Sequence, residues 1–226
     1  MTGMLASVKN LVEAEFVLSA NVDIIDLKQP EFGALGALPV ELVAEIVEKI
    51  GGSCPISATV GDLPMDAEII FNAVSEMAKT GVDFVKIGFF PDDDWLSIVH
   101  KLADLTPNTK LIAVLFADTQ PNFLIIPELK KANFAGVMLD TMHKQNGSLT
   151  EVMSPETIGE FVELAKKETL ICGLAGSLRL ENIAELLPFN ADYLGFRGAL
   201  CNQHNRVSEL DLNALEQIRT AIFHHA

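Results

Sequence analysis

The sequence predicts an α/β protein, a single (β/α)₈ TIM barrel that spans residues 1–226. Three observations support this fold class. Short apolar segments alternate about eight times with amphipathic helical segments, which is the pattern of a parallel barrel. A chain of 226 residues that is 49% hydrophobic can bury one sizeable core, and no linker or composition shift divides it. An open, doubly wound sheet is the main alternative, but it usually has fewer strands and a glycine-rich first turn, which is missing here.

The first part of the chain alternates between strands and helices. Residues 4–7 form a short apolar strand, and residues 10–20 form a helix. Residues 23–28 form the second strand, because apolar pairs are punctuated by charge. Residues 40–50 form an amphipathic helix that stops at two glycines, and residues 55–61 form the third strand, which Asp-Leu-Pro ends.

The middle of the chain continues the alternation. Residues 66–79 form a long helix that a glycine closes, and residues 83–89 form the fourth strand. Residues 92–105 form a helix whose leading aspartates suit a helix N-terminus. Residues 110–117 form the fifth strand, and residues 123–132 form a helix that Pro127 shortens or kinks.

The last part completes eight strands. Residues 136–140, 170–175 and 193–197 are the expected strands, because each is a short apolar run that ends at Asp-Thr or at glycine. Residues 144–155 are the longest stretch without expected structure, and we predict a mobile loop over the site there. The remaining helices cover residues 154–168, 180–187 and 211–224.

Charged residues recur at the C-terminal ends of consecutive strands. Asp26 and Lys28 close the second strand, Lys86 lies within the fourth, and Asp140 closes the sixth with Lys144 shortly after it. In a barrel these ends converge on one mouth. Burying charge costs several kcal/mol unless the charge is paired or used, so the pattern predicts a polar site. A surface ion pair at the second strand, or a Lys–Asp network that only fills the barrel, is the alternative.

The two strand lysines are candidates for covalent chemistry. Period-two alternation places Phe84, Lys86 and Gly88 on one face of the fourth strand. A lysine in a partly apolar site loses its charge more easily and can form a Schiff base with a carbonyl substrate. Lys28 is the other candidate, and the residues by themselves favour Lys86 because it lies deeper.

A second group of residues, at the ends of the last two strands, predicts a phosphate-binding site. Gly176 and Ser177 follow the seventh strand, and Arg197 and Gly198 follow the eighth. Barrels often bind phosphate there through backbone N–H groups, and an arginine adds a bidentate donor. The alternative is that these glycines only make tight turns. His204 and Arg206 could also reach this site.

The composition limits the possible partners. A net charge of −15 argues against nucleic acid or an anionic membrane and leaves a small-molecule substrate. The chain shows no signal peptide or apolar run of about 20 residues, and its three cysteines form no disulfide framework, so we expect a cytoplasmic protein. No motif indicates a cofactor or a metal. A homo-oligomer is compatible with the sequence, but no interface can be read from it.

Several segments, taken in order, resemble one family. They are Asp-Ile-Ile-Asp-Leu-Lys (23–28), Ser-Ala-Thr-Val-Gly-Asp (57–62), Asp-Phe-Val-Lys-Ile-Gly (83–88), Met-Leu-Asp-Thr (138–141), Leu-Ala-Gly-Ser (174–177) and Arg-Gly-Ala (197–199). In this order they are similar to the (5-formylfuran-3-yl)methyl phosphate synthase family of methanofuran-type cofactor biosynthesis, found in methanogens and some methylotrophic bacteria. The resemblance runs from the first strand to the last.

The resemblance implies a lyase that condenses two molecules of glyceraldehyde 3-phosphate. One phosphate and water are lost, and a furan aldehyde phosphate forms by chemistry like that of class I aldolases. The resemblance implies that Lys28 is the Schiff-base lysine and Lys86 the proton-transferring lysine. It also implies that Asp26, Asp140 and Lys144 are supporting polar residues.

One segment departs from the family pattern. After Arg-Gly-Ala a glycine-rich basic run is expected, but residues 201–206 read Cys-Asn-Gln-His-Asn-Arg. Asparagine can replace glycine in tight turns, so a phosphate site can persist there. A simpler class I aldolase acting on phosphorylated sugars, and a non-catalytic barrel that binds a phosphorylated metabolite, are the alternative functions.

Overall fold

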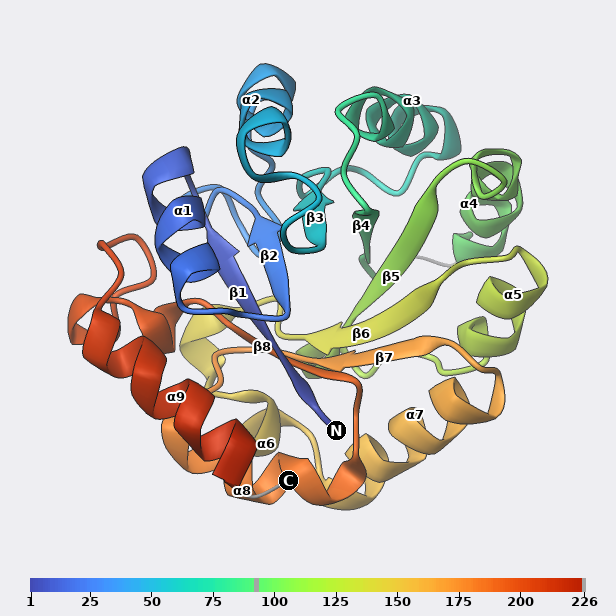
Figure 1. The fold of residues 1–226 in the computed structure, drawn as a ribbon. Helices are drawn as coiled ribbons and strands as arrows, with labels where there is room; N and C mark the ends of the chain where they lie inside the picture. The colour runs from blue at the N-terminus through green and yellow to red at the C-terminus, as the bar shows by residue number, and fades with distance from the viewer. Residues whose placement is uncertain (92–93, 225–226) are drawn as a thin grey trace.

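Eight parallel strands form a closed barrel in a computed structural model of the chain, which describes residues 1–91 and 94–224. Each strand pairs with the next in the chain, and β8 returns to β1 through the register Gly3↔Tyr193 to Ala6↔Phe196. The helices surround the barrel (Figure 1). The predicted (β/α)₈ barrel is therefore confirmed.

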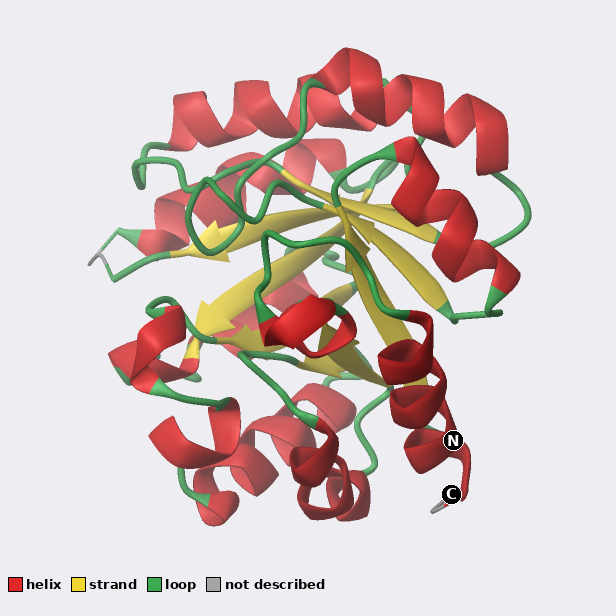
Figure 2. Cartoon of the chain, turned by 90° about the vertical axis from the view of Figure 1, so that its left-hand side faces the viewer, coloured by secondary structure: helices red, strands yellow, loops and turns green. Residues whose placement is uncertain are grey.

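The strands lie close to the predicted ranges. They are β1 (Gly3–Val8), β2 (Ile24–Leu27), β3 (Ile56–Thr59), β4 (Phe84–Phe89), β5 (Lys110–Phe116), β6 (Gly136–Asp140), β7 (Ile171–Leu174) and β8 (Tyr193–Phe196). The described helices are α1 (Leu11–Ser19), α2 (Val40–Ile50), α3 (Ala67–Ala78), α4 (Trp95–Leu102), α5 (Ile125–Lys131), α6 (Leu149–Val152), α7 (Pro155–Lys167), α8 (Leu180–Leu186) and α9 (Leu212–His224). Figure 2 shows the strands enclosed by these helices. Over the described residues, no helix is both long and apolar enough to cross a bilayer.

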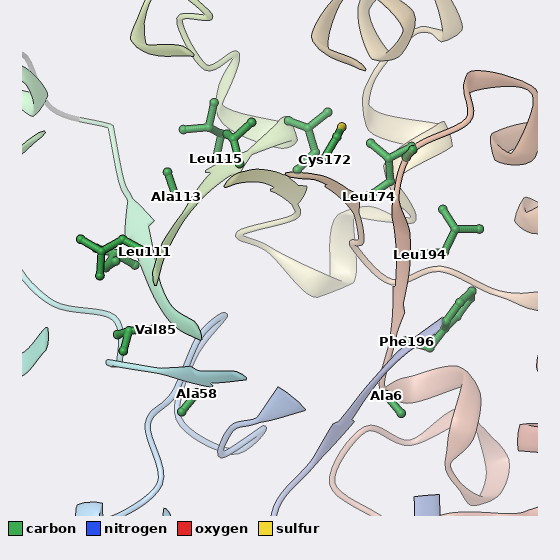
Figure 3. Close-up of a cluster of buried hydrophobic side chains, with 14 of the residues drawn as sticks. Ala6, Ala58, Val85, Leu111, Ala113, Leu115, Cys172, Leu174, Leu194 and Phe196 are labelled. Carbon is green, nitrogen blue, oxygen red and sulfur yellow. The ribbon is translucent and has the colours of Figure 1, made fainter. Parts of the chain in front are cut away.

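Alternation along each strand divides the core into two parts. Outward side chains pack under the helices, and Figure 3 shows ten of them labelled around the outside of the ring of strands. Inward side chains such as Leu5, Ile24, Ile112 and Met138 fill the N-terminal part of the barrel. The C-terminal part instead holds buried polar and charged side chains. The apolar layer thus forms a floor beneath a polar mouth.

The expectation of a structureless loop at residues 144–155 was wrong. The segment contains a 3₁₀ turn (Lys144–Asn146) and α6. Ser148 and Glu151 form a capping box, in which the Ser148 backbone N–H and hydroxyl donate to Glu151 Oε2 at 2.6 and 2.9 Å. Leu149 is fully buried and anchors the turn.

The helix expected at residues 92–105 is described from Trp95 to Leu105, as α4 followed by a 3₁₀ turn. The expected start, at residues 92–93, lies outside the described residues.

Candidate active site

The five charged residues predicted from the strand ends lie together at the C-terminal mouth of the barrel. Lys86 Nζ lies 3.0 Å from Asp26 Oδ1, and Lys144 Nζ lies 2.5 Å from Asp140 Oδ1. Lys28 lines the same pocket as Lys86, Asp140 and Lys144, and the charges of Asp140 and Asp26 both act on its amine. Asp26, Lys28, Lys86 and Asp140 are all less than 7% exposed. The sequence therefore predicted the members of this cluster, and the structure shows how they are paired.

Strand register decides that Lys86 pairs with Asp26. Asp26 lies beside Ser57 of β3, and Thr59 lies beside Lys86 of β4. The short Ser57 side chain leaves room for Lys86 to reach across β3. Ser57 Oγ donates to Asp26 Oδ1 at 2.6 Å, and Ser7 Oγ of β1 donates to Asp26 Oδ2 at 2.9 Å. Both Asp26 oxygens are thereby held in place.

Asp26 carries its charge despite complete burial. Burial by itself raises the pKa of this carboxyl. The charges of Lys86 and Lys28 and the Ser57 hydrogen bond together lower the pKa by more than burial raises it. The pKa of Asp26 therefore lies below its ordinary value. An ionised Asp26 supplies the counter-charge for Lys86.

Of the three lysines in the cluster, Lys86 and Lys144 each form an ion pair. Lys28 has no ion-pair partner among the described residues. Burial disfavours its charged form and lowers the pKa of the amine to about 8, against the opposing attraction of Asp140 and Asp26. A lysine with this pKa is partly neutral near pH 8, and the neutral amine is the nucleophile in imine formation.

Asp140 links the cluster to the next loop. Burial raises the pKa of Asp140, but Lys144, Lys28 and the Thr141 backbone N–H lower it to about 2. That N–H donates to Asp140 Oδ1 at 2.7 Å. Lys144 also donates to the Thr141 carbonyl at 2.6 Å, so its ammonium is fixed at the rim of the mouth.

These side chains open into a pocket of about 150 Å³ at the mouth of the barrel. Six cationic side chains line it, against one carboxylate, Asp140, among its described lining residues. The cations are Lys28, Lys86, Lys144, Arg179, Arg197 and Arg206. In a chain of net charge −15, this local excess of positive charge favours an anionic ligand.

The predicted phosphate-site residues Gly176, Ser177 and Gly198 also line the pocket. Gly176 has a φ of 111°, and a Cβ there would lie 2.9 Å from the Thr141 backbone nitrogen. The chain therefore needs glycine where β7 turns against the loop after β6. Ser177 is left-handed with a φ of 48°, and its hydroxyl donates to the Lys144 carbonyl at 3.3 Å.

Arg197 lines the same pocket, but its guanidinium is already engaged. Its Nη1 and Nη2 donate to the carboxylate of Glu13, which is also buried. Its Nε, Nη1 and Nη2 donate to the carbonyls of Arg206, Ser7 and Ser208, respectively. The expected role of Arg197 as a bidentate phosphate donor therefore does not fit this geometry. Arg197 instead anchors the loop after β8 to β1 and α1.

Two other strand-end carboxylates hold loops rather than enter the cluster. Asp62 accepts from the backbone N–H groups of Ala34 and Leu35 at 2.7 Å each, which fixes the loop after β2. Asp118 accepts from the backbone N–H groups of Met142 and His143 at 2.6 and 2.8 Å, which fixes the loop after β6.

Sequence reasoning missed four residues of the site. Ser7 and Ser57 hold Asp26, and their signal was a hydroxyl at an inward position of a buried strand. Glu13, in the first turn of α1, gives no local sign that it pairs with a residue 184 positions away. Arg179 was not singled out, although it directly follows the loop after β7. Over the described residues, no group of three His, Cys, Asp or Glu residues could hold a metal ion.

Comparisons with known proteins indicate one family. The family profile described as 4-HFC-P synthase matches residues 4–219. A putative (5-formylfuran-3-yl)methyl phosphate synthase of Methylorubrum extorquens is 40% identical over 208 residues, covering 92% of this chain and 86% of that protein. The (5-formylfuran-3-yl)methyl phosphate synthase of Methanopyrus kandleri is 32% identical over 215 residues, covering 90% and 91% of the two chains.

The similarity to solved structures supports the fold alone. The phosphoribosyl anthranilate isomerase of Thermus thermophilus superposes with a TM-score of 0.68 at 13% identity, over 100% of both chains. TrpF of Jonesia denitrificans superposes with a TM-score of 0.69 at 13% identity, over 99% of this chain and 97% of that one.

Proposed function

The chain belongs to the 4-HFC-P synthase family, and we propose that it catalyses its reaction through an imine on Lys28. It is an enzyme with (5-formylfuran-3-yl)methyl phosphate synthase activity, the synthase of methanofuran biosynthesis, and its substrate is a phosphorylated small molecule. The substrate that we propose is glyceraldehyde 3-phosphate, of which two molecules condense. The cationic pocket supports this choice, because each molecule carries a phosphate and an aldehyde.

The first step is attack by the neutral Lys28 amine on the aldehyde carbon of one substrate molecule. The resulting carbinolamine loses water and becomes an iminium ion, which makes the neighbouring C–H acidic. Asp26 holds the Lys86 side chain in the same pocket as Lys28, where its ammonium is placed to donate a proton to the departing hydroxyl.

The second step joins the two molecules. Loss of a proton from the carbon beside the iminium gives an enamine, and the resulting carbon nucleophile attacks the second triose phosphate. Closure of the furan ring expels one phosphate and, in net, two water molecules, and hydrolysis of the imine releases the aldehyde product and returns the free Lys28 amine. Lys144 and Asp140 lie at the rim of the mouth, where they can neutralise the departing phosphate and transfer protons.

One observation carries this proposal: Lys28 is a buried amine of lowered pKa that, unlike Lys86 and Lys144, has no ion-pair partner among the described residues. The Lys86 nitrogen is engaged by Asp26 in an ion pair, which leaves it less free to attack a carbonyl carbon. Lys144 is disfavoured for the same reason. The family resemblance also implies Lys28 as the Schiff-base lysine, whereas the depth argument from the sequence favoured Lys86.

Product analysis tests the proposed reaction. The protein is incubated with glyceraldehyde 3-phosphate, and the furan aldehyde is followed by ultraviolet absorbance and mass spectrometry while released phosphate is measured. We expect one phosphate per furan product, loss of both signals in Lys28→Met, and normal rates in the surface control Lys79→Met. A six-carbon product that retains both phosphates would instead indicate a simpler aldolase, and no product would favour a binding protein.

We also propose a cytoplasmic location. Cys54, Cys172 and Cys201 are free and buried thiols, which suits a reducing compartment.

A further inference from the structure

We propose that Arg179 binds the phosphoryl group of the substrate and so selects phosphorylated aldehydes over unphosphorylated ones. This inference rests on the proposed function of the pocket, and it assigns to Arg179 the role that the sequence suggested for Arg197. Arg179 lies between the loop after β7 and the start of α8, and it lines the same pocket as Lys28 and Lys86.

The Arg179 guanidinium has unused hydrogen-bonding capacity. Its Nη1 is buried and has no hydrogen-bond acceptor among the described residues. Buried polar groups in native proteins are nearly always paired, and an arginine left without an acceptor inside an anion-attracting pocket therefore points to a ligand. The planar guanidinium matches the geometry of a phosphate through two parallel N–H donors.

The other cations of the pocket are committed elsewhere. Among the described residues, Lys86, Lys144 and Arg197 are ion-paired with Asp26, Asp140 and Glu13, respectively. Arg206 donates through Nη2 to the Gly33 carbonyl at 3.0 Å, across the mouth to the loop after β2. Lys28 is the proposed nucleophile. By this comparison, Arg179 is the cation that is free to bind phosphate.

Arg179 also lies in a suitable place. Its Nη1 is 3.9 Å from the point where a Cβ on Gly198 would lie, so it faces the glycine turn after β8. Gly176 and Ser177 line the pocket from the other loop. A Cβ at Gly198 would lie in van der Waals contact with Nη1, so the guanidinium lies directly beside this turn.

The backbone at Arg179 is held firmly. Its N–H donates to Asn182 Oδ1 at 2.8 Å, and Asn182 Nδ2 donates to Thr150 Oγ1 of α6 at 3.0 Å. Asn182 is only 7% exposed. A side chain on such a fixed base loses little freedom when it binds, which favours a specific contact.

The test compares Arg179→Met and Arg179→Lys with the wild type on two substrates, glyceraldehyde 3-phosphate and glyceraldehyde. A bidentate charge-assisted contact predicts that Arg179→Met lowers kcat/KM for the phosphorylated aldehyde by about 100-fold, mainly through KM. Imine formation with glyceraldehyde, measured by borohydride trapping on Lys28, should change by less than about threefold. Arg179→Lys should keep part of the preference, because it retains the charge without the planar fork.

Arg219→Met is the matched control. Arg219 is the other described arginine with a buried unpartnered nitrogen, its Nε, but it lies on α9 with its guanidinium 5.5 Å from the centre of the Phe223 ring. We expect its loss to leave the substrate preference unchanged. An equal loss on both substrates in Arg179→Met, or an unchanged KM for glyceraldehyde 3-phosphate, would overturn the proposal.

Direct binding separates this inference from the proposed reaction. Calorimetric titration with inorganic phosphate should give a dissociation constant at least tenfold weaker in Arg179→Met than in the wild type, with thermal melts confirming that the variant is folded. If the wild type makes no furan product, the proposed reaction fails, yet this titration still decides the role of Arg179. Equal phosphate affinity in the two proteins would refute that role.

Discussion

Replacing Lys28 with methionine should stabilise the protein at neutral pH while it abolishes activity. The structure places the Lys28 amine in a buried site that lowers its pKa from an ordinary 10.5 to about 8. Each pKa unit corresponds to 1.36 kcal/mol, so keeping this lysine charged at pH 7 costs about 3 kcal/mol of folding free energy. Methionine has a similar length and carries no charge, so the variant avoids that cost.

The sign of the effect depends on pH. The folded protein loses the Lys28 proton near pH 8, whereas the unfolded chain keeps it to about pH 10.4. Between these values the unfolded state binds more protons, so the wild type gains stability as the pH rises. The advantage of Lys28→Met should therefore shrink from about 3 kcal/mol at pH 7 to about 1.5 kcal/mol at pH 9.5.

Urea and thermal unfolding at the two pH values measure this difference. For a chain of this length we expect the melting temperature of Lys28→Met to rise by roughly 6–12 °C at pH 7. Lys86→Met is the matched comparison, because it leaves Asp26 buried without its partner and should lose about 3–5 kcal/mol. A Lys28→Met variant that is less stable than the wild type, or an advantage that is the same at both pH values, would refute the reasoning.

Three further predictions follow from the same network. The kcat/KM of the wild type should rise with pH through about 8, because the neutral Lys28 amine reacts. Asp140→Asn should move this rise to lower pH, because it removes the strongest charge that raises the Lys28 pKa. A pH–rate profile that is the same in the variant contradicts the assignment. Asp26→Asn should lower kcat by at least about 100-fold, because Lys86 loses the carboxylate that holds it in position for proton transfer. The exposed Asp83→Asn should keep full activity in the same assay. Glu13→Ala should lower the free energy of unfolding by about 3–5 kcal/mol in urea titrations, because Arg197 is left buried and unpaired; a loss below 1 kcal/mol would show that the pair does not anchor the loop.

Much of the barrel could be predicted because its signals are local. Short apolar runs that end at turn residues predicted all eight strands, and Lys86 points inward as the alternation of β4 requires. The turn at residues 148–152 was missed, although Ser148 and Glu151 have the spacing of a capping box. Four residues of helix carry too little periodicity to be separated from a loop.

The pairing within the site could not be predicted, because it depends on long-range register. Asp26 meets Lys86 across β3, and Arg197 meets Glu13 through the closure of β8 on β1. Nothing near Lys28 in the sequence indicates that it is the unpaired lysine. An arginine beside a glycine turn also looks the same in sequence whether its donors are all engaged, as in Arg197, or one nitrogen has no partner among the described residues, as in Arg179.

Borohydride trapping tests the central claim most directly. The protein is incubated with glyceraldehyde 3-phosphate, reduced with borohydride and digested, and the modified lysine is identified by mass spectrometry. An imine on Lys28 predicts a stable adduct on that residue in the wild type and in the surface control Lys79→Met. An adduct on Lys86 instead would exchange the roles of the two lysines. Furan product without an adduct on either lysine would contradict the covalent mechanism.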